Sequence, residues 1–317
     1  MLRLFKIRGG LIQEIQCPAE QLEQALPQAD WIDAHEPDEG ERALLQRLLH
    51  TDLPELDDVE EIEASARFFL DQAGIHVHSL FLAQTEGRHS TASVACILKR
   101  ECLITIREDD LADFRLLRLR ARRGQVAVQS PQSLLVTLFE QKVENHADTL
   151  ENLHRQLERV SYLVLEDEES ELEDAIGKLA RLEDSNGKIR LCLMDTQRGI
   201  SFLLRHLHGQ QEQPETLREI MRDIETLMSH TTFLFDKINF LMDSTQGFIN
   251  IEQNQIIKIF SIAAVVFLPP TLVASMYGMN FDHMPELKWL LGYPWAIGLM
   301  IASGIAPYWY FKRKGWL

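Results

Sequence analysis

Two long stretches near the C-terminal end of the chain contain no charged residue, and they constrain its fold more than any other feature. They cover residues 259–280 and 289–311. A helix of about 20 apolar residues is long enough to cross the roughly 30 Å hydrocarbon core of a bilayer. No comparable stretch occurs earlier. The sequence therefore predicts a soluble N-terminal part followed by two transmembrane helices, at residues 259–278 and 290–311.

Basic residues are more numerous on one side of the two predicted spans than on the other. Lys258 precedes the first span, and Lys-Arg-Lys follows the second at positions 312–314, whereas the connecting loop contains a single lysine. Because positive residues stay on the cytoplasmic side of a membrane, both termini are expected in the cytoplasm. This orientation predicts a periplasmic loop at 279–289 and a basic cytoplasmic tail at 312–317. We expect a multi-pass protein of the bacterial inner membrane.

The soluble part begins with mixed strand and helix patterns. Alternating apolar residues around Gly9 and Gly10 predict a hairpin within 2–15. Further strand-like runs lie at 66–70, 75–83, 91–99 and 102–107, and helices are predicted at 39–49 and from about position 60. An α/β domain is expected over residues 1–130.

From position 131 the pattern is helical, with apolar residues every three or four positions. The acidic cluster at 166–174 predicts the tip of a helical hairpin that spans 131–213. After Pro214 no strong helix breaker occurs before Pro269, so one helix of roughly 90 Å is predicted from 215 to 276. Its part at 214–258 is predicted to form a cytoplasmic stalk. The expected fold class is an α+β membrane protein.

Net charge and motifs exclude several function classes. The chain has a formal net charge of -16, which argues against nucleic acid as a partner. The sequence contains no Walker A motif and no Ser/His/Asp, Cys/His or paired-carboxylate pattern typical of catalysis. We expect a protein that is not an enzyme and uses no organic cofactor.

One side of the first predicted span differs from a helix face that contacts only lipid. Steps of three and four residues from Asp243 to Ser275 meet mostly polar or small side chains: Gly247, Asn250, Asn254, Ile257, Ser261, Ala264, Leu268 and Thr271. Two helices cannot enclose a pore, so this seam would line one only in an oligomer. Close helix packing through small residues is the alternative.

The turn after the first span carries a family resemblance. Tyr-Gly-Met-Asn at 277–280, followed by Met-Pro-Glu-Leu at 284–287, closely resembles the CorA family of magnesium transport channels. The likeness extends through 248–254, 267–271 and 310–317, and in the soluble part through 31–33 and 58–67, where it is similar to the enterobacterial-type branch. The position of the motif, between a proline-containing span and a short acidic loop, makes the match specific.

The resemblance implies a homopentamer with a funnel-shaped cytoplasmic domain. It implies a selectivity filter at Gly278, Met279 and Asn280. It further implies that Asp243, Asn254 and Thr271 line a pore with hydrophobic constrictions at Ile257 and Leu268, and the seam adds Asn250 and Ser261 to the predicted lining. Asparagine amides and glycine carbonyls suit Mg²⁺, which prefers six oxygen ligands and gives up its water reluctantly. A site of this kind holds a hydrated ion and also releases it.

Acidic residues also occur outside the predicted pore. Asp282 and Glu286 in the loop would attract cations or simply keep the loop soluble. The resemblance implies that intracellular Mg²⁺, bound between subunits, closes the channel. The carboxylates considered for this regulatory site are Glu219, Asp223, Asp57 and Asp58.

The sequence thus predicts a channel for potential-driven Mg²⁺ influx, with Co²⁺ and Ni²⁺ as further ions. Its expected partners are other copies of itself, membrane lipid and divalent cations. Two alternatives remain open at this point, a zinc transporter of the same superfamily and a membrane-tethered cytosolic sensor without transport.

Overall fold

The computed structural model describes residues 1–18, 21–49, 67–85, 87–166, 172–207, 213–279 and 284–316. The chain divides into two compact units, Met1–Met242 and Asp243–Leu317. Each unit is treated by itself below.

The first unit is built on a seven-stranded sheet with the order β2-β1-β3-β7-β6-β5-β4. The strands are β1 (Leu2–Arg8), β2 (Leu11–Ile15), β3 (Trp31–His35), β4 (Phe68–Leu70), β5 (Ile75–Thr85), β6 (Arg88–Leu98) and β7 (Leu103–Arg107). Neighbouring strands are antiparallel except β3 and β7, which pair in parallel. The predicted hairpin is confirmed, because Gly9 and Gly10 join β1 to β2 with φ values of 58° and 80°.

Most of the predicted strands are present, and one was missed. The runs at 75–83, 91–99 and 102–107 correspond to β5, β6 and β7, and β5 and β6 extend further into a long hairpin. Of the run at 66–70, Ala66 lies outside the described residues, Arg67 precedes the strand, and Phe68–Leu70 becomes β4. Strand β3 was not predicted, because it is short and contains a charged residue, Asp33.

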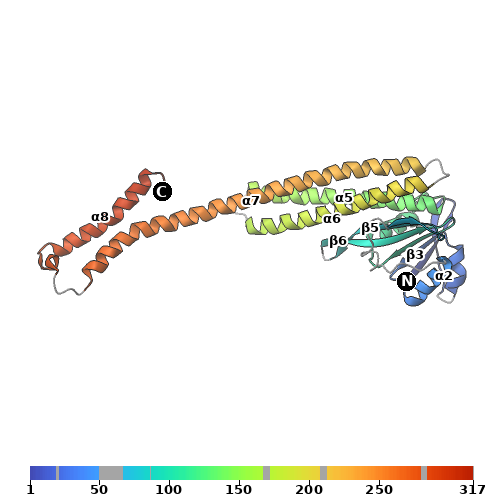
Figure 1. Cartoon of the computed structure of the whole chain (residues 1–317), viewed down its shortest axis with the longest axis horizontal. Helices are drawn as coiled ribbons and strands as arrows, with labels where there is room; N and C mark the ends of the chain where they lie inside the picture. The colour runs from blue at the N-terminus through green and yellow to red at the C-terminus, as the bar shows by residue number, and fades with distance from the viewer. Residues whose placement is uncertain are drawn as a thin grey trace. The chain divides into compact units, whose positions relative to one another are not determined.

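Helices cover both faces of this sheet. On one face lie α1 (Leu22–Ala25), the 3-10 turn η2 (Leu26–Gln28) and α2 (Glu39–Leu49), which confirms the predicted helix at 39–49. On the other face lie α4 (Ala112–Arg122), α5 (Pro131–Leu165) and α6 (Leu172–His206), as Figure 1 shows. Because successive strand residues point to opposite faces, Trp31 and Leu103 join the α5–α6 core while Ile32 and Ile104 join the α2 core.

The long helices begin where the sequence predicts. Ser130 and Ser133 form a capping box at the start of α5, with Pro131 in the first turn. Helix α7 (Gln213–Tyr277) has 65 residues and continues without a break through position 258, so no change of secondary structure marks the predicted end of the stalk. The expected helix starting near position 60 and the centre of the predicted hairpin tip, at 167–171, lie outside the described residues.

In the second unit, α7 is followed by the 3-10 turn η3 (Pro285–Lys288) and helix α8 (Gly292–Arg313). Glycine is required at the start of α8, since a Cβ on Gly292 would collide with the carbonyl oxygen of Glu286. Further along, α7 and α8 approach closely: a Cβ on Gly304 would lie 3.2 Å from Cγ of Pro270.

Candidate functional site

Among the described residues, α7 is the one helix whose length and composition allow it to cross a membrane. This agrees with the first predicted span. Helix α8, the second predicted span, carries several Gly, Pro, Tyr and Trp residues, which are less hydrophobic than Leu or Ile. Its crossing of the membrane therefore stays a prediction.

The side of α7 that faces α8 is recognised by its low exposure. In the part of α7 after position 260, the buried and half-buried residues are Ile262, Ala263, Val266, Pro269, Pro270, Val273 and Tyr277. A matching row on α8 comprises Ala296, Ile297, Met300, Ser303, Gly304, Pro307 and Phe311. Both rows repeat every three or four residues, as expected for two helices in contact along one face. The contact between Gly304 and Pro270 lies within these rows.

The predicted pore-lining seam lies on a different side of α7. Every one of its members is exposed within the chain: Asp243, Gly247, Asn250, Asn254, Ile257, Ser261, Ala264, Leu268, Thr271 and Ser275. The hydroxyl of Thr271 donates a hydrogen bond to the carbonyl oxygen of Phe267 at 2.7 Å, so its lone pairs remain free to accept. After position 261, the seam thus forms an exposed face of small and polar residues, with Leu268 as the exception, on the side of α7 opposite the residues that face α8.

The part of the seam nearest Lys258 borders a groove. Asn254, Ile257 and Ser261 line a space of about 560 Å³ together with Lys258 and the end of the chain, where Phe311 stacks on Trp316 at 5.5 Å between ring centroids. This part of the seam is therefore accessible but close to the basic tail.

The predicted selectivity filter is only partly described. Helix α7 ends at Tyr277, and the amide of Gly278 still donates to the carbonyl oxygen of Ala274 at 3.0 Å. Met279 is exposed and follows directly. Asn280 and Asp282 lie outside the described residues. Glu286 is half-buried in η3, and its carbonyl oxygen accepts from the amide of Trp289 at 3.3 Å.

The predicted regulatory carboxylates meet acidic partners that sequence reasoning missed. Asp223 on α7 lines a groove of about 240 Å³ with Glu140 and Glu144 on α5. The pKa of Glu140 is raised by burial and by the negative charges of Glu144, Glu219 and Asp223. The sequence signal that could have indicated this acidic groove is the spacing of Glu140 and Glu144, which lie four positions apart on a predicted helix. Asp57 and Asp58 lie outside the described residues.

These carboxylates do not form a complete metal site within one chain. Among the described residues, no group of three or more His, Cys, Asp or Glu side chains is arranged to hold a metal ion. A cation at the groove of Glu140, Glu144 and Asp223 would need further ligands from elsewhere.

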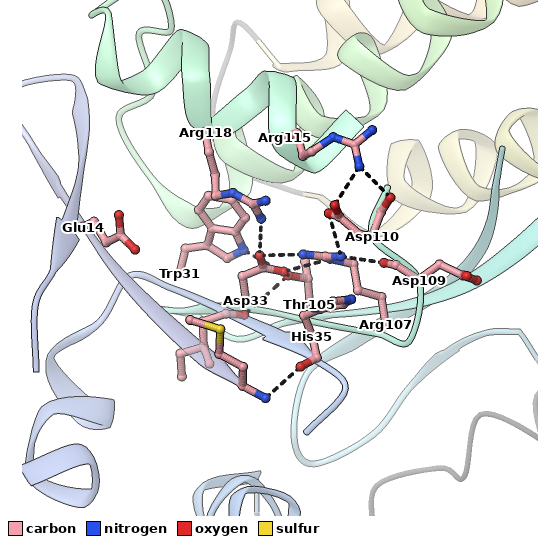
Figure 2. A network of polar contacts seen from close by, with 12 residues as sticks. Glu14, Trp31, Asp33, His35, Thr105, Arg107, Asp109, Asp110, Arg115 and Arg118 are labelled. Carbon is pink, nitrogen blue, oxygen red and sulfur yellow. Dashed lines mark hydrogen bonds and ion pairs between the residues drawn. The ribbon is translucent and has the colours of Figure 1, made fainter. Parts of the chain in front are cut away.

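One buried carboxylate of the soluble unit, Asp33, belongs to a structural network. Figure 2 shows Asp33 on β3 between two arginines, Arg107 of β7 at 3.1 Å and Arg118 of α4 at 2.8 Å. The hydroxyl of Thr105 also donates to Asp33, and it accepts a hydrogen bond from the indole of Trp31. Asp33 is fully buried and its charge is compensated, so this network fastens α4 to the sheet and offers no free ligand.

Known proteins resemble this chain over its whole length. The model of the family described as CorA-like Mg²⁺ transporter protein matches residues 27–313. The magnesium transport proteins CorA of Salmonella typhimurium and of Escherichia coli are each 48% identical to it over 319 residues, covering 100% of both chains. Among solved structures, the complete CorA magnesium transporter from Methanocaldococcus jannaschii has a TM-score of 0.76 at 19% identity, covering 100% of this chain and 99% of that one. That structural likeness bears on the fold alone.

Proposed function

The chain belongs to the family of CorA-like Mg²⁺ transporter proteins, and on this premise we propose that it is one subunit of a homopentameric channel for Mg²⁺ influx. It is a magnesium transporter and not an enzyme. The observation that carries the channel mechanism is the exposed seam on α7, whose members after position 261 lie on the side of the helix opposite α8.

Assembly is required because the two membrane helices of one chain cannot surround an ion. In the proposed pentamer, five copies of α7 turn their seams toward a common axis, and α8 lies outside them against lipid. In this arrangement Asn254, Ser261 and Thr271 face the pore and the adjacent subunits, which avoids the free-energy cost of exposing polar side chains to hydrocarbon. Ile257 and Leu268 interrupt the polar seam and form the constrictions at which the pore closes by losing water.

Ion selection is assigned to the turn after α7. Gly278, Met279 and Asn280 from five subunits surround the outer mouth, and carbonyl and amide oxygens hold Mg²⁺ through its water shell. Gly278 suits a crowded ring, since a Cβ there would already lie 3.2 Å from the carbonyl oxygen of Ala274. Asp282 and Glu286 in the loop raise the local cation concentration. Co²⁺ and Ni²⁺, with similar hydrated sizes and charge, are expected to pass as well.

The membrane potential supplies the driving force. A charge moving inward gains about 2.3 kcal/mol per 100 mV, so a divalent ion gains about twice that. The proposed location is the bacterial inner membrane, with both termini in the cytoplasm, because Lys258 and the basic residues at 312–314 lie on one side of the two predicted spans and the loop on the other side contains a single lysine.

A channel of this kind needs closure when the cytoplasm is rich in Mg²⁺. We assign the sensor to Glu219 and Asp223, with Asp57 and Asp58 as further candidates. The neighbouring Glu140 supports this assignment, because burial and the negative charges of Glu144, Glu219 and Asp223 raise its pKa even though Arg120 pairs with Glu144 at 2.8 Å. The missing ligands would come from the adjacent subunit, which couples ion binding to the packing of subunits.

Substitution of the filter asparagine tests the proposal. We expect Asn280→Ala to reduce Mg²⁺ influx into liposomes to the level of protein-free vesicles while the pentamer still assembles. Gln255→Ala, which removes an exposed amide on the side of α7 opposite the seam, should leave influx unchanged. Influx should also fall when the internal Mg²⁺ concentration is raised.

Unchanged influx in the Asn280→Ala variant would refute the filter assignment. Faster transport of Zn²⁺ than of Mg²⁺ in a competition assay would support a zinc transporter. A monomer without flux of any divalent ion would support a membrane-tethered sensor.

A further inference from the structure

A second groove lies in the soluble unit, far along the sequence from any residue of the pore. It has a volume of about 440 Å³ and opens between the turn end of the β5–β6 hairpin, α5 and α6. Figure 1 shows these two helices lying over the same two strands. Neither the seam nor the regulatory carboxylates contribute to it.

The wall formed by the hairpin is held in place. Lys188 of α6 donates a hydrogen bond to the carbonyl oxygen of His89 at 2.8 Å, and the ring of His89 is hydrogen-bonded to the hydroxyl of Ser185 at 3.0 Å. Lys188 in turn pairs with Asp184 at 2.7 Å. Because both contacts join β6 to α6, the groove is a fixed feature of the fold.

The groove is basic although the protein is acidic. Arg159, Lys178 and Arg181 line it, and no Asp or Glu is among its described lining residues. Lys178 pairs with Asp174 at 2.8 Å, and the charge of Arg181 also lowers the pKa of Asp174, but within the described part of the chain neither Arg159 nor Arg181 forms an ion pair of its own. A chain with a net charge of -16 thus presents two available guanidinium groups at one cavity. Guanidinium groups match the geometry of phosphate oxygens.

The remaining residues of the groove form an apolar floor surrounded by polar side chains, which suits a partly apolar ligand. Leu153, Val160 and Leu182 are buried and form its floor. The side-chain amides of Gln84, Asn152 and Gln156 stand around this floor and are able both to donate and to accept hydrogen bonds. Small-molecule sites commonly have this composition and a volume of about 300–1,000 Å³.

We propose that this groove binds a nucleoside phosphate, with the phosphates at Arg159 and Arg181 and the base on the apolar floor. The amides around the floor provide the polar contacts that a base edge requires. Such a ligand joins α5, α6 and the β5–β6 hairpin. The proposal does not depend on the ion pathway, since it concerns binding to the soluble unit.

The test is a binding titration with ATP on the full-length protein in detergent, in buffer without Mg²⁺. The wild-type protein should bind ATP with measurable heat. The double variant Arg159→Gln, Arg181→Gln should bind at least about tenfold more weakly, because charge-assisted hydrogen bonds to phosphate are lost. The matched control is Arg155→Gln, which removes an exposed arginine of α5 that does not line the groove and should leave ATP affinity unchanged.

Titration with tripolyphosphate decides the class of ligand. Tripolyphosphate should bind more weakly than ATP, because it lacks the base and sugar that cover the floor. Chelation of residual Mg²⁺ by ATP would act equally on wild type and double variant, so a difference between them reports the groove. The proposal is overturned if wild-type protein does not bind ATP, if Arg155→Gln loses as much affinity as the double variant, or if tripolyphosphate binds as tightly as ATP.

Discussion

At the scale of single residues, a buried polar cluster connects the sheet of the soluble unit to α5 and α6. The ammonium group of Lys142 donates to the hydroxyl of Ser79 at 2.8 Å, and Ser79 donates to Asp195 at 2.6 Å. Lys142 also lies 4.3 Å above the ring centroid of Phe81. One turn further along α5, His146 is fully buried, and within the described residues its ring nitrogens have no hydrogen-bond partner.

The first prediction concerns this histidine. Burial and the nearby charge of Lys142 lower the pKa of His146 from 6.5 to about 3. As pH falls below 6.5, the unfolded chain takes up a proton at this position and the folded chain does not, so folding stability is lost between pH 6.5 and 3. At pH 5 the loss is about 2 kcal/mol. The melting temperature of His146→Leu should therefore fall less between pH 7 and pH 5 than that of the wild type.

Asp113 has the opposite effect on the pH dependence of folding stability, but it does not affect the comparison of wild type with His146→Leu. Burial raises its pKa to about 6, so the folded chain takes up a proton there before the unfolded chain does. Both proteins contain Asp113, so its contribution is shared. Equal pH dependence in wild type and variant would contradict the assignment to His146.

At the scale of elements, α7 performs two tasks along one continuous helix. Before position 242, one face of α7 is buried in the core of the soluble unit. This face comprises Leu217, Ile220, Ile224, Leu234, Ile238 and Leu241. After position 260 its least exposed residues face α8, and two of them are prolines, which cannot donate backbone hydrogen bonds. Gly304 of α8 approaches Pro270, so the prolines lie in a helix contact and not in the seam.

The second prediction tests this contact. Leucine in place of Gly304 has no room, because even a Cβ would lie 3.2 Å from Pro270, and overpacking costs about 1–3 kcal/mol. Gly304→Leu should lower the melting temperature of the detergent-solubilised protein. The matched control is Gly298→Leu on the same helix, where no described atom lies within 4 Å of the position that a Cβ would take. Equal melting temperatures of the two variants would show that α8 does not approach α7 at Gly304.

At the scale of the whole molecule, electrostatic repulsion is distributed unevenly. The net charge of -16 includes the carboxylates that α5 and α7 bring together at Glu140, Glu144, Glu219 and Asp223. Arg120 lowers the pKa of Glu140 but does not outweigh burial and its acidic neighbours. A divalent cation would relieve this repulsion, and the protein would then be more stable with Mg²⁺ bound.

The third prediction follows from this coupling. Adding Mg²⁺ should raise the melting temperature of the protein, and removing Mg²⁺ with EDTA should reverse the change. At a Mg²⁺ concentration 100 times the dissociation constant, binding adds about 2.7 kcal/mol to the free energy of unfolding. Asp223→Asn should reduce this Mg²⁺ effect, because it removes a ligand and part of the repulsion. Glu151→Gln, at an exposed position of α5 outside the groove, serves as the control. A full Mg²⁺ effect in Asp223→Asn would place the sensor elsewhere.

Local patterns were sufficient to predict most elements of the fold. Paired glycines predicted the β1–β2 turn, and helical periodicity predicted α2, α5, α6 and α7, because these signals depend on residues a few positions apart. Strand β3 was missed because its charged residue, Asp33, is neutralised by Arg107, which lies 74 positions away. Sequence reasoning also missed the groove shared by Glu140 and Asp223 and the basic groove at Arg159 and Arg181, because each brings together residues that are far apart in the sequence.

By itself, the sequence determined that the C-terminal part is apolar enough for a membrane, that one stripe of α7 is polar, and that the turn after α7 resembles a known family. It left open whether the stripe faces another helix of the same chain or stays free. Only the tertiary structure decided this, because the face that α8 covers depends on the close approach at Gly304. Periodicity defines the faces of a helix, and contacts between residues distant in the sequence decide which face is occupied.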